Sequence, residues 1–381
     1  MELHKVQVVT AQQYTSRYFR EWNGPEITKL PTFDNTKLVA INTCPLWGIV
    51  RYTHHKHMGG SGRAMALEAG SAAHEVFAAH RLYSFVEYAA FFYEGATSEA
   101  IQRAFTATGI RIFGDRRFGE MVAAVDTRED FRTRCQQFAL TALYNCGFYD
   151  DPSDKRRTTT NVEEMCIAYM DKNDFKSRLP YWDGAEFLGI EIGVDVVIHL
   201  EYTSDDGMHD TLIIRFIGKA DGIHYIDREM SDLRVHENKT ASRLGDAWEM
   251  SWETNHQPTG YMIALSAMLS LNISQAEMLG SCLPLPKAYT INGLARVVVK
   301  RQQWQLIEWF KWVAHTAHLH QRYSVDPTNA PMYTHSCNRY FRPCSFIPLC
   351  ATEPEERVHM FNEMNVDEWN PLQGQAEVTD E

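Results

Sequence analysis

The sequence lacks the features that mark membrane-embedded, exported and repetitive proteins. Its 381 residues contain no run of about 18 or more apolar residues, which argues against a transmembrane helix. The first residues, MELHKVQVVTAQQY, have neither the basic segment nor the apolar segment of a secretory signal peptide. No internal repeat or compositionally biased segment stands out. We therefore expect a cytoplasmic globular protein with no membrane partner.

The sequence also has little positive charge. A net charge of −12 at pH 7 argues against a broad nucleic-acid surface. However, residues 352–381 carry nine acids and one base, which leaves −4 over residues 1–351 and makes this acidic tail a candidate protein-binding segment. Basic clusters elsewhere are candidate phosphate contacts, although such clusters usually lie on solvated surface. They are Arg111 with Arg116 and Arg117, Lys155-Arg156-Arg157, and Lys300-Arg301.

The pattern of apolar residues predicts an α/β protein. Its length allows one large domain or two modest ones. Helical patterns dominate the first part of the chain and β patterns follow, which indicates an α/β core with a large helical insertion before its central sheet. The predicted helices cover residues 63–93, parts of 97–149, a helix capped by Thr160 or Asn161, 257–271 and 302–321. The predicted strands cover 189–203, 211–227, 233–240 and residues near 288–300.

Two acids and a lysine stand out in the predicted hairpin. Strand residues alternate between faces, so Glu237 and Lys239 point the same way, and Asp221 on the preceding strand can lie beside them. Two adjacent carboxylates repel each other, and Mg²⁺ or Mn²⁺ prefers such oxygen ligands. The ion can polarise a phosphate oxygen while the lysine stabilises developing charge, which suits phosphodiester hydrolysis. The alternative is a surface hairpin with a cross-strand salt bridge.

Four short motifs occur in a recognisable order. They are GSAAHE at 70–75, GKADGI at 218–223, HENKTA at 236–241 and QPTGY at 257–261. In this order the sequence resembles the RecB-type branch of the PD-(D/E)XK nucleases, as found in phage exonucleases, CRISPR-associated RecB-like exonucleases and the AddB nuclease domain. With the cysteines described below, the resemblance extends over residues 44–350 and implies a bacterial or phage-infected host cytosol.

The resemblance implies a role for each residue that matches a motif. His74, on the first long helix, would be a metal ligand. Asp221 and Glu237 would be the carboxylate ligands, with a backbone carbonyl near Asn238 contributing. Lys239 would be the catalytic lysine. Taken by itself, His74 has the alternative of a helix-surface or hydrogen-bonded core histidine.

Three further residues belong to the expected site. Gln257 and Tyr261 are one helical turn apart and would face the DNA and the active site. Their alternative is a helix start with a half-buried tyrosine. Glu191, in LGIEIGV, lies where related phage sequences often have a glutamate before the sheet, and a charged strand end explains it equally well.

The eight cysteines divide into two groups. Disulfides are not expected in a reducing cytosol. We interpret four dispersed cysteines as small core residues, namely Cys135, Cys146, Cys166 and Cys282. Three others cluster near the end of the chain and a fourth lies far upstream, namely Cys337, Cys344, Cys350 and Cys44.

Three clustered thiols and one distant thiol suit either a tetrahedral metal or an iron–sulfur cluster. Their chemistry alone does not choose between zinc and iron. The resemblance favours a [4Fe–4S] cluster, since many RecB-type nucleases hold one through one early and three late cysteines, with Zn²⁺ as the alternative. The usual late spacing is C-x₂-C-x₅-C, whereas this chain has C-x₆-C-x₅-C, so it departs from the pattern at Cys337.

The resemblance also implies a domain organisation. We expect an N-terminal extension at 1–40, a RecB-like nuclease domain at 41–350 and an acidic tail at 351–381. Within the nuclease domain we expect the helical insertion at about 95–185, the catalytic sheet at about 186–300 and the cysteine cluster at 337–350. The insertion would form a passage for a single DNA strand, with Arg111, Arg116, Arg117, Arg156 and Arg157 as contacts.

The expected function is therefore a Mg²⁺- or Mn²⁺-dependent deoxyribonuclease with a PD-(D/E)XK restriction-endonuclease-like core. An exonuclease acting on single strands or ends in DNA recombination, repair or processing is favoured. One alternative is a catalytically silent nuclease-fold subunit that binds DNA or acts as an adaptor. Another is a structure-specific endonuclease.

Overall fold

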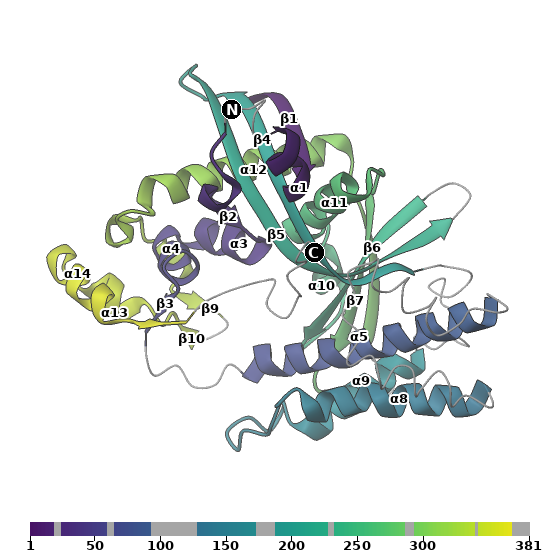
Figure 1. Cartoon of the computed structure of the whole chain (residues 1–381). Helices are drawn as coiled ribbons and strands as arrows, with labels where there is room; N and C mark the ends of the chain where they lie inside the picture. The colour runs from purple at the N-terminus through teal and green to yellow at the C-terminus, as the bar shows by residue number, and fades with distance from the viewer. Residues whose placement is uncertain are drawn as a thin grey trace.

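The computed structural model describes residues 1–18, 24–58, 65–92, 128–172, 187–227, 232–285, 293–339 and 342–367. Within these ranges the chain forms an α/β fold in which helices flank a central mixed sheet (Figure 1). None of the described helices is both long enough and apolar enough to cross a membrane.

The central sheet has the strand order β1-β4-β5-β6-β7-β8 in the described part of the chain, with the short β2 paired to β5. β4 and β5 pair antiparallel along nearly their whole length. β6 and β7 run parallel, since a helical crossover connects them. The strands are β1 (Glu2–Thr10), β2 (Thr32–Phe33), β4 (Phe187–Thr203), β5 (His209–Asp227), β6 (Asp232–Ala241), β7 (Gln275–Cys282) and β8 (Leu294–Lys300).

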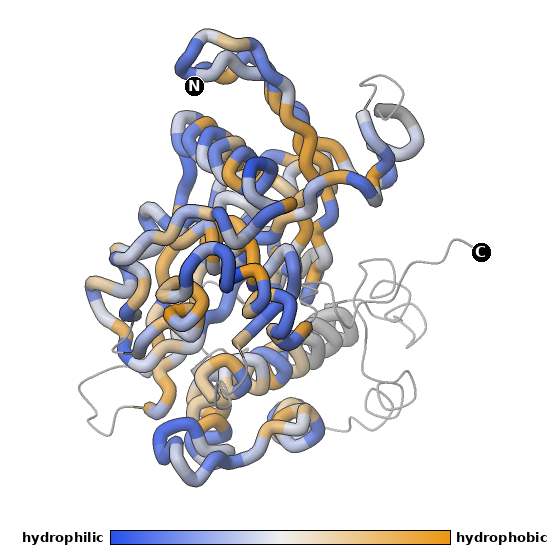
Figure 2. Tube along the Cα trace, turned by 90° about the vertical axis from the view of Figure 1, so that its left-hand side faces the viewer, coloured by the Kyte–Doolittle hydropathy of each residue, from blue (hydrophilic) through white to orange (hydrophobic). Residues whose placement is uncertain are grey.

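Helices cover both faces of this sheet. The adjacent β7 residues Met278 and Leu279 point to opposite faces of the sheet. Leu279 packs with the helices on one face, and Met278 packs with the helices on the other. The face of Leu279 is covered by α5 (Met65–Phe92), α8 (Arg128–Asn145) and α9 (Thr159–Lys172). The face of Met278 is covered by α3 (Asn35–Thr43), α4 (Pro45–Tyr52), α11 (His256–Leu269) and α12 (Gln303–Tyr323). Figure 2 shows hydrophobic stretches running through the middle of the fold.

The remaining described elements are short. The helix α10 (Asp246–Ser251) precedes α11, and α1 (Ala11–Gln13) runs into a π-helical turn at Tyr14–Tyr18. Single 3₁₀ turns cover Ile27–Lys29, Pro327–Asn329 and Thr334–Ser336. Near the C-terminus lie β9 (Asn338–Arg339), β10 (Arg342–Pro343), α13 (Ile347–Ala351) and α14 (Pro354–Glu363), and β3 (Lys56–His57) pairs with β11 (Asn365–Val366).

A sharp corner between α3 and α4 places Cys44. α3 begins at the N-cap Asp34, whose carboxylate accepts a 2.6 Å hydrogen bond from the Lys37 amide. Cys44 is extended between the two helices, and Pro45 starts α4. The helices approach so closely that a Cβ on Gly48 would lie 2.4 Å from the Ile41 backbone nitrogen. Glycine at position 48 therefore permits this corner.

Most predicted elements are present, and three differences have physical causes. Residues 1–40 are not a separate extension, since β1 pairs with β4 and β2 with β5. β7 was not predicted because it is buried on both faces and shows no alternation of apolar and polar residues. α9 is capped by Thr158 instead of Thr160 or Asn161, since the Asn161 amide donates to Thr158 Oγ1 at 3.2 Å.

The predicted helical insertion is described only in part. α8 and α9 confirm helix within it, whereas residues 93–127 and 173–186 lie outside the described residues. The catalytic sheet expected at 186–300 corresponds to β4 to β8. The expected acidic tail begins with α14 and β11, and residues 368–381 lie outside the described residues.

A buried histidine should make stability depend on pH. His320 on α12 is 8% exposed, packs against the Phe33 ring, and neither ring nitrogen has a hydrogen-bond partner among the described residues. Burial, with the nearby Lys37 charge, lowers the pKa of His320 to about 3. An unfolded histidine titrates near about 6.5, so the unfolded state binds more protons below that pH. Stability should therefore fall as the pH drops from about 6.5 towards 3, by at most about 1.4 kcal/mol per pH unit.

We expect His320→Leu to reduce the loss of unfolding free energy between pH 7 and pH 5, measured by urea denaturation. His315→Gln is the matched control, because His315 lies on the same helix but is exposed. Equal losses in wild type and His320→Leu would contradict the assignment.

Candidate functional site

The candidate site lies where β5 and β6 separate. The two strands pair from Asp227 opposite Asp232 to Gly222 opposite His236. Beyond this point β5 stays paired with β4 and β6 stays paired with β7, so the two strands diverge and leave a fork between them. Side chains bridge the strands in the fork. The Asn238 amide donates to Asp221 Oδ2 at 2.6 Å, and the Asp221 amide donates to Glu237 Oε1 at 3.3 Å. The fork therefore holds both predicted carboxylates in buried positions.

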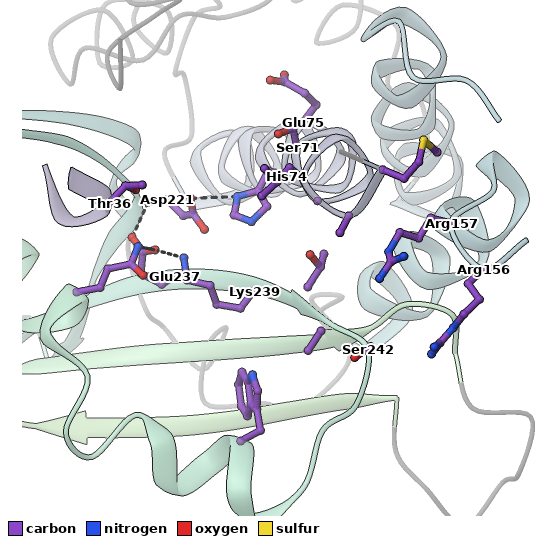
Figure 3. A pocket seen from close by; sticks show the side chains of 18 of the residues that line it. Thr36, Ser71, His74, Glu75, Arg156, Arg157, Asp221, Glu237, Lys239 and Ser242 are labelled. Atoms are coloured by element: carbon purple, nitrogen blue, oxygen red, sulfur yellow. Dashed lines mark hydrogen bonds and ion pairs between the residues drawn. The ribbon is translucent and has the colours of Figure 1, made fainter. Parts of the chain in front are cut away.

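α5 brings His74 to the same fork. His74 Nδ1 lies 3.3 Å from Asp221 Oδ1 (Figure 3). The helix approaches β6 closely one turn earlier, where a Cβ on Gly70 would lie 3.1 Å from Thr240 Oγ1. The small residue at the start of the GSAAHE motif thus lets the helix approach close enough for His74 to contact Asp221.

Lys239 and two residues of α11 complete the group around Glu237. Lys239 Nζ donates to Glu237 Oε2 at 2.8 Å, and Gln257 Nε2 reaches the same oxygen at 3.4 Å. Tyr261 is buried one turn after Gln257, with its ring beside Gly218, whose added Cβ would lie 3.1 Å from Tyr261 Cε1. The predicted placement of Gln257 and Tyr261 on one face of this helix is confirmed.

Glu191 also lies at the fork. The strand register places it on β4 opposite Asp221, and its Oε2 is 2.6 Å from Lys219 Nζ. Its φ of 52° is in the left-handed region, which costs a non-glycine residue on the order of 1 kcal/mol. Burial and the Asp221 charge raise the pKa of Glu191. A strained backbone at this carboxylate supports its inclusion in the candidate site.

The two central carboxylates differ in charge state. Burial would raise the pKa of Asp221, but the His74 imidazole and the Lys239 ammonium outweigh it and hold that pKa well below its ordinary value. Burial raises the pKa of Glu237 to about 7, with the Asp221 charge adding to it and Lys239 opposing it. Burial also lowers the pKa of Lys239, but the Glu237 and Asp221 carboxylates raise it more. Asp221 is therefore ionised and Lys239 protonated at neutral pH.

The carboxylates are close but do not yet surround a common point. Among the described residues, the ligating atoms of His74, Asp221 and Glu237 are not all within 4.8 Å of one another. Glu237 Oε2 instead accepts from Lys239 Nζ and Gln257 Nε2.

The fork opens into a cavity of about 1600 Å³. Its walls come from the start of α3, from α5, from the loop before α9, from the ends of β5 and β6, and from α10 and α11. Arg156 and Arg157 line this cavity, so the structure brings two predicted DNA contacts to the candidate site (Figure 3). Arg157 also pairs with Asp154 at 2.7 Å. Arg111, Arg116 and Arg117 lie outside the described residues.

The sequence reasoning missed a buried support for the fork. Arg81 on α5 is 1% exposed and donates to the Asp221 carbonyl at 2.9 Å. It also contacts the Tyr169 hydroxyl, which donates to Asn238 Oδ1 at 3.1 Å. Arg81 follows His74 by two helical turns, so both lie on one face of the helix. This spacing could have predicted that Arg81 lies near the site of His74.

The four patterned cysteines converge away from this fork. Cys44 is at the α3–α4 corner, the Cys344 amide donates to the Cys337 carbonyl at 2.8 Å, and Cys350 lies on α13. Burial, together with the neighbouring thiols of Cys44, Cys344 and Cys337, raises the pKa of the Cys350 thiol to about 11. Cys44 is thus far from the late cysteines in the chain, yet the fold brings its thiol close enough to affect the pKa of Cys350.

The other cysteines were expected to be core residues. Cys166 and Cys282 are buried as expected. Cys146 is exposed, and that prediction was wrong because Cys146 lies just past the end of α8 instead of on its packed face. The side chain of Cys135 lies outside the described residues.

Comparisons with known proteins identify no family. No family model matches the chain, and no curated protein matches it. The crystal structure of SSO0001 is 14% identical in sequence and has a TM-score of 0.26. That alignment covers 65% of this chain and 94% of SSO0001. A TM-score this low supports no conclusion about fold or function.

Proposed function

We propose that this protein is a metal-dependent DNA nuclease of the RecB-like PD-(D/E)XK type. The observation that carries the proposal is the convergence of His74, Asp221, Glu237 and Lys239 at the fork between β5 and β6. Three separate motifs supply these side chains, and a fourth supplies Gln257 beside them. A salt-bridged surface hairpin, the main alternative for these residues, does not account for two buried carboxylates beside a histidine.

The donors fit a divalent cation. His74, Asp221, Glu237 and the Asn238 carbonyl would hold Mg²⁺ or Mn²⁺, with Glu191 nearby as a further carboxylate. Burial and the Asp221 charge raise the pKa of Glu237 despite the Lys239 ammonium, and a bound divalent ion would lower it. When bound, the ion supplies Lewis-acid polarisation of a phosphate oxygen.

The chain's own residues supply the other requirements of phosphodiester hydrolysis. Lys239 is held as a cation at the fork and can stabilise negative charge that develops on the phosphate. Gln257 donates to the Glu237 carboxylate and helps to orient it. The buried Tyr261 ring packs beside Gly218 of β5. Arg156 and Arg157 offer positive charge at the wall of the cavity for the DNA backbone.

The cavity also suggests the form of the substrate. α5, the loop before α9 and the ends of β5 and β6 line it, and Asp221 and Glu237 are among the lining residues. A bordered cavity of this kind suits a single strand or a DNA end better than the middle of a duplex. We therefore favour an exonuclease acting in DNA recombination, repair or processing.

The test is cleavage of end-labelled linear and circular single-stranded DNA with Mg²⁺, Mn²⁺ or EDTA. Metal-dependent degradation of the linear substrate alone is the expected result. Cutting of circular DNA would make the protein an endonuclease at the same site. Binding without cleavage under any metal would overturn the enzymatic proposal in favour of an adaptor or DNA-binding subunit.

We also propose that Cys44, Cys337, Cys344 and Cys350 hold a [4Fe–4S] cluster. These four thiols lie near enough to one another to raise the pKa of Cys350, which suits either a multi-iron cluster or a single zinc ion. The resemblance to RecB-type nucleases favours the cluster, and zinc remains the alternative. The cluster would join the two ends of the nuclease domain.

A further inference from the structure

A second cluster of metal-ligating side chains includes His236, which precedes Glu237 on β6 and so points to the opposite face of the sheet. His224 on β5, His236 on β6 and Glu277 on β7 come from three adjacent strands, and the register pairs His236 directly with Glu277. All three are buried, at 2%, 0% and 0% exposure. One ligating atom from each lies within 4.8 Å of the others.

A chain of hydrogen bonds sets the orientation of the His236 ring. Arg81 is only a donor, so the Tyr169 oxygen accepts from it and the Tyr169 hydroxyl donates to Asn238 Oδ1. His236 Nε2 lies 3.3 Å from that same oxygen, so Nε2 carries a proton and donates as well. The other ring nitrogen, Nδ1, faces Glu277 Oε2, 3.5 Å away.

The other side of Glu277 is held by arginines. Arg234 Nη1 lies 3.5 Å from Oε1, and Arg296 Nε contacts the same oxygen. Glu277 Oε2 is buried and faces His236 Nδ1. His236 Nδ1 and Glu277 Oε2 therefore stand where a single ion could bind both, together with a ring nitrogen of His224.

We propose that His224, His236 and Glu277 bind a divalent transition-metal ion, of which Zn²⁺ is the representative. Two imidazoles and one carboxylate are a common ligand set for such ions. The surroundings resemble those of metal ligands, since the second nitrogen of His236 donates to an amide oxygen and the second oxygen of Glu277 accepts from guanidinium groups.

The position of the cluster indicates a structural task. An ion there would connect β5, β6 and β7 directly behind the fork. Asn238 joins the two places, because its side chain accepts from His236 and its backbone amide donates to Asp221. The proposal does not depend on nuclease activity, since its readout is the metal itself.

The test measures metal per chain in the full-length protein, purified without chelators and after addition of Zn²⁺. His224→Asn should bind one equivalent fewer than wild type, with affinity at this site weakened at least about 100-fold. His199→Asn is the matched control, since His199 is buried in the same sheet but outside the cluster. Equal metal content in wild type and His224→Asn would overturn the proposal and leave a proton shared between His236 and Glu277.

A measurement on wild type keeps the test valid if His224→Asn does not fold. Zinc-edge X-ray absorption of the Zn²⁺-loaded protein should show nitrogen and oxygen neighbours with the outer-shell scattering of imidazole. A purely sulfur shell would assign all zinc to the cysteines and overturn the proposal.

Discussion

Asp221→Asn should lose metal-dependent DNA cleavage by about 10³-fold or more. Asp221 is the carboxylate that stays ionised in the fork, and it contacts both His74 and the Asn238 amide. The amide of asparagine has nearly the same shape but carries no charge, so the variant should fold yet bind the ion poorly. A loss of several kcal/mol of transition-state stabilisation corresponds to this factor.

The measurement is the initial rate of nucleotide release from linear single-stranded DNA at saturating Mn²⁺. Asp206→Asn is the control, because Asp206 is exposed in the turn between β4 and β5, does not line the cavity, and should keep the wild-type rate. Circular dichroism and the melting temperature of both variants check that the fold persists. If Asp221→Asn retains cleavage within a few-fold of wild type, the fork is not the active site.

Cys350→Ser should lose both bound iron and much of the stability of the fold. The thiols of the other three cysteines contribute to the raised pKa of Cys350. Arg357 Nη2 also donates a 3.1 Å hydrogen bond to the backbone carbonyl of Cys350. A cross-link between Cys44 and Cys350 closes a loop over most of the chain. The chain-entropy model gives on the order of 5 kcal/mol for a link of that length.

The readouts are iron and acid-labile sulfide per chain, the visible spectrum after anaerobic purification, and the melting temperature. Cys146→Ser is the matched control, since Cys146 is exposed and outside the cluster. A colourless wild-type protein that holds zinc at these cysteines would replace the iron–sulfur proposal with its zinc alternative. A Cys350→Ser variant with unchanged iron and melting temperature would exclude Cys350 as a ligand.

Local pattern was sufficient for the residues of the fork. The two-residue period of a strand places Glu237 and Lys239 on one face, and they do contact each other. The 3.6-residue period of a helix aligns Gln257 with Tyr261, and both line the cavity. These groupings need only short segments, which is why one sequence revealed them.

Long-range pairing was beyond local pattern. β1 reads as an isolated amphipathic stretch, and its place at the edge of the sheet is decided by pairing with β4, almost 200 residues later. His224, His236 and Glu277 lie on three different strands. Glu277 belongs to β7, which was not predicted because its apolar and polar residues do not alternate. Their meeting depends on the parallel register of β6 and β7.

By itself, the amino-acid sequence determined the chemical groups available and their local faces: an acid, an E-N-K strand, a histidine on a helix and four patterned thiols. Only the tertiary structure decided that His74 contacts Asp221, that Arg81 donates to the Asp221 carbonyl, and that Cys44 lies near the late cysteines. The physical reason is that each of these contacts joins segments far apart in the chain, and their distances depend on how the sheet and helices pack as a whole.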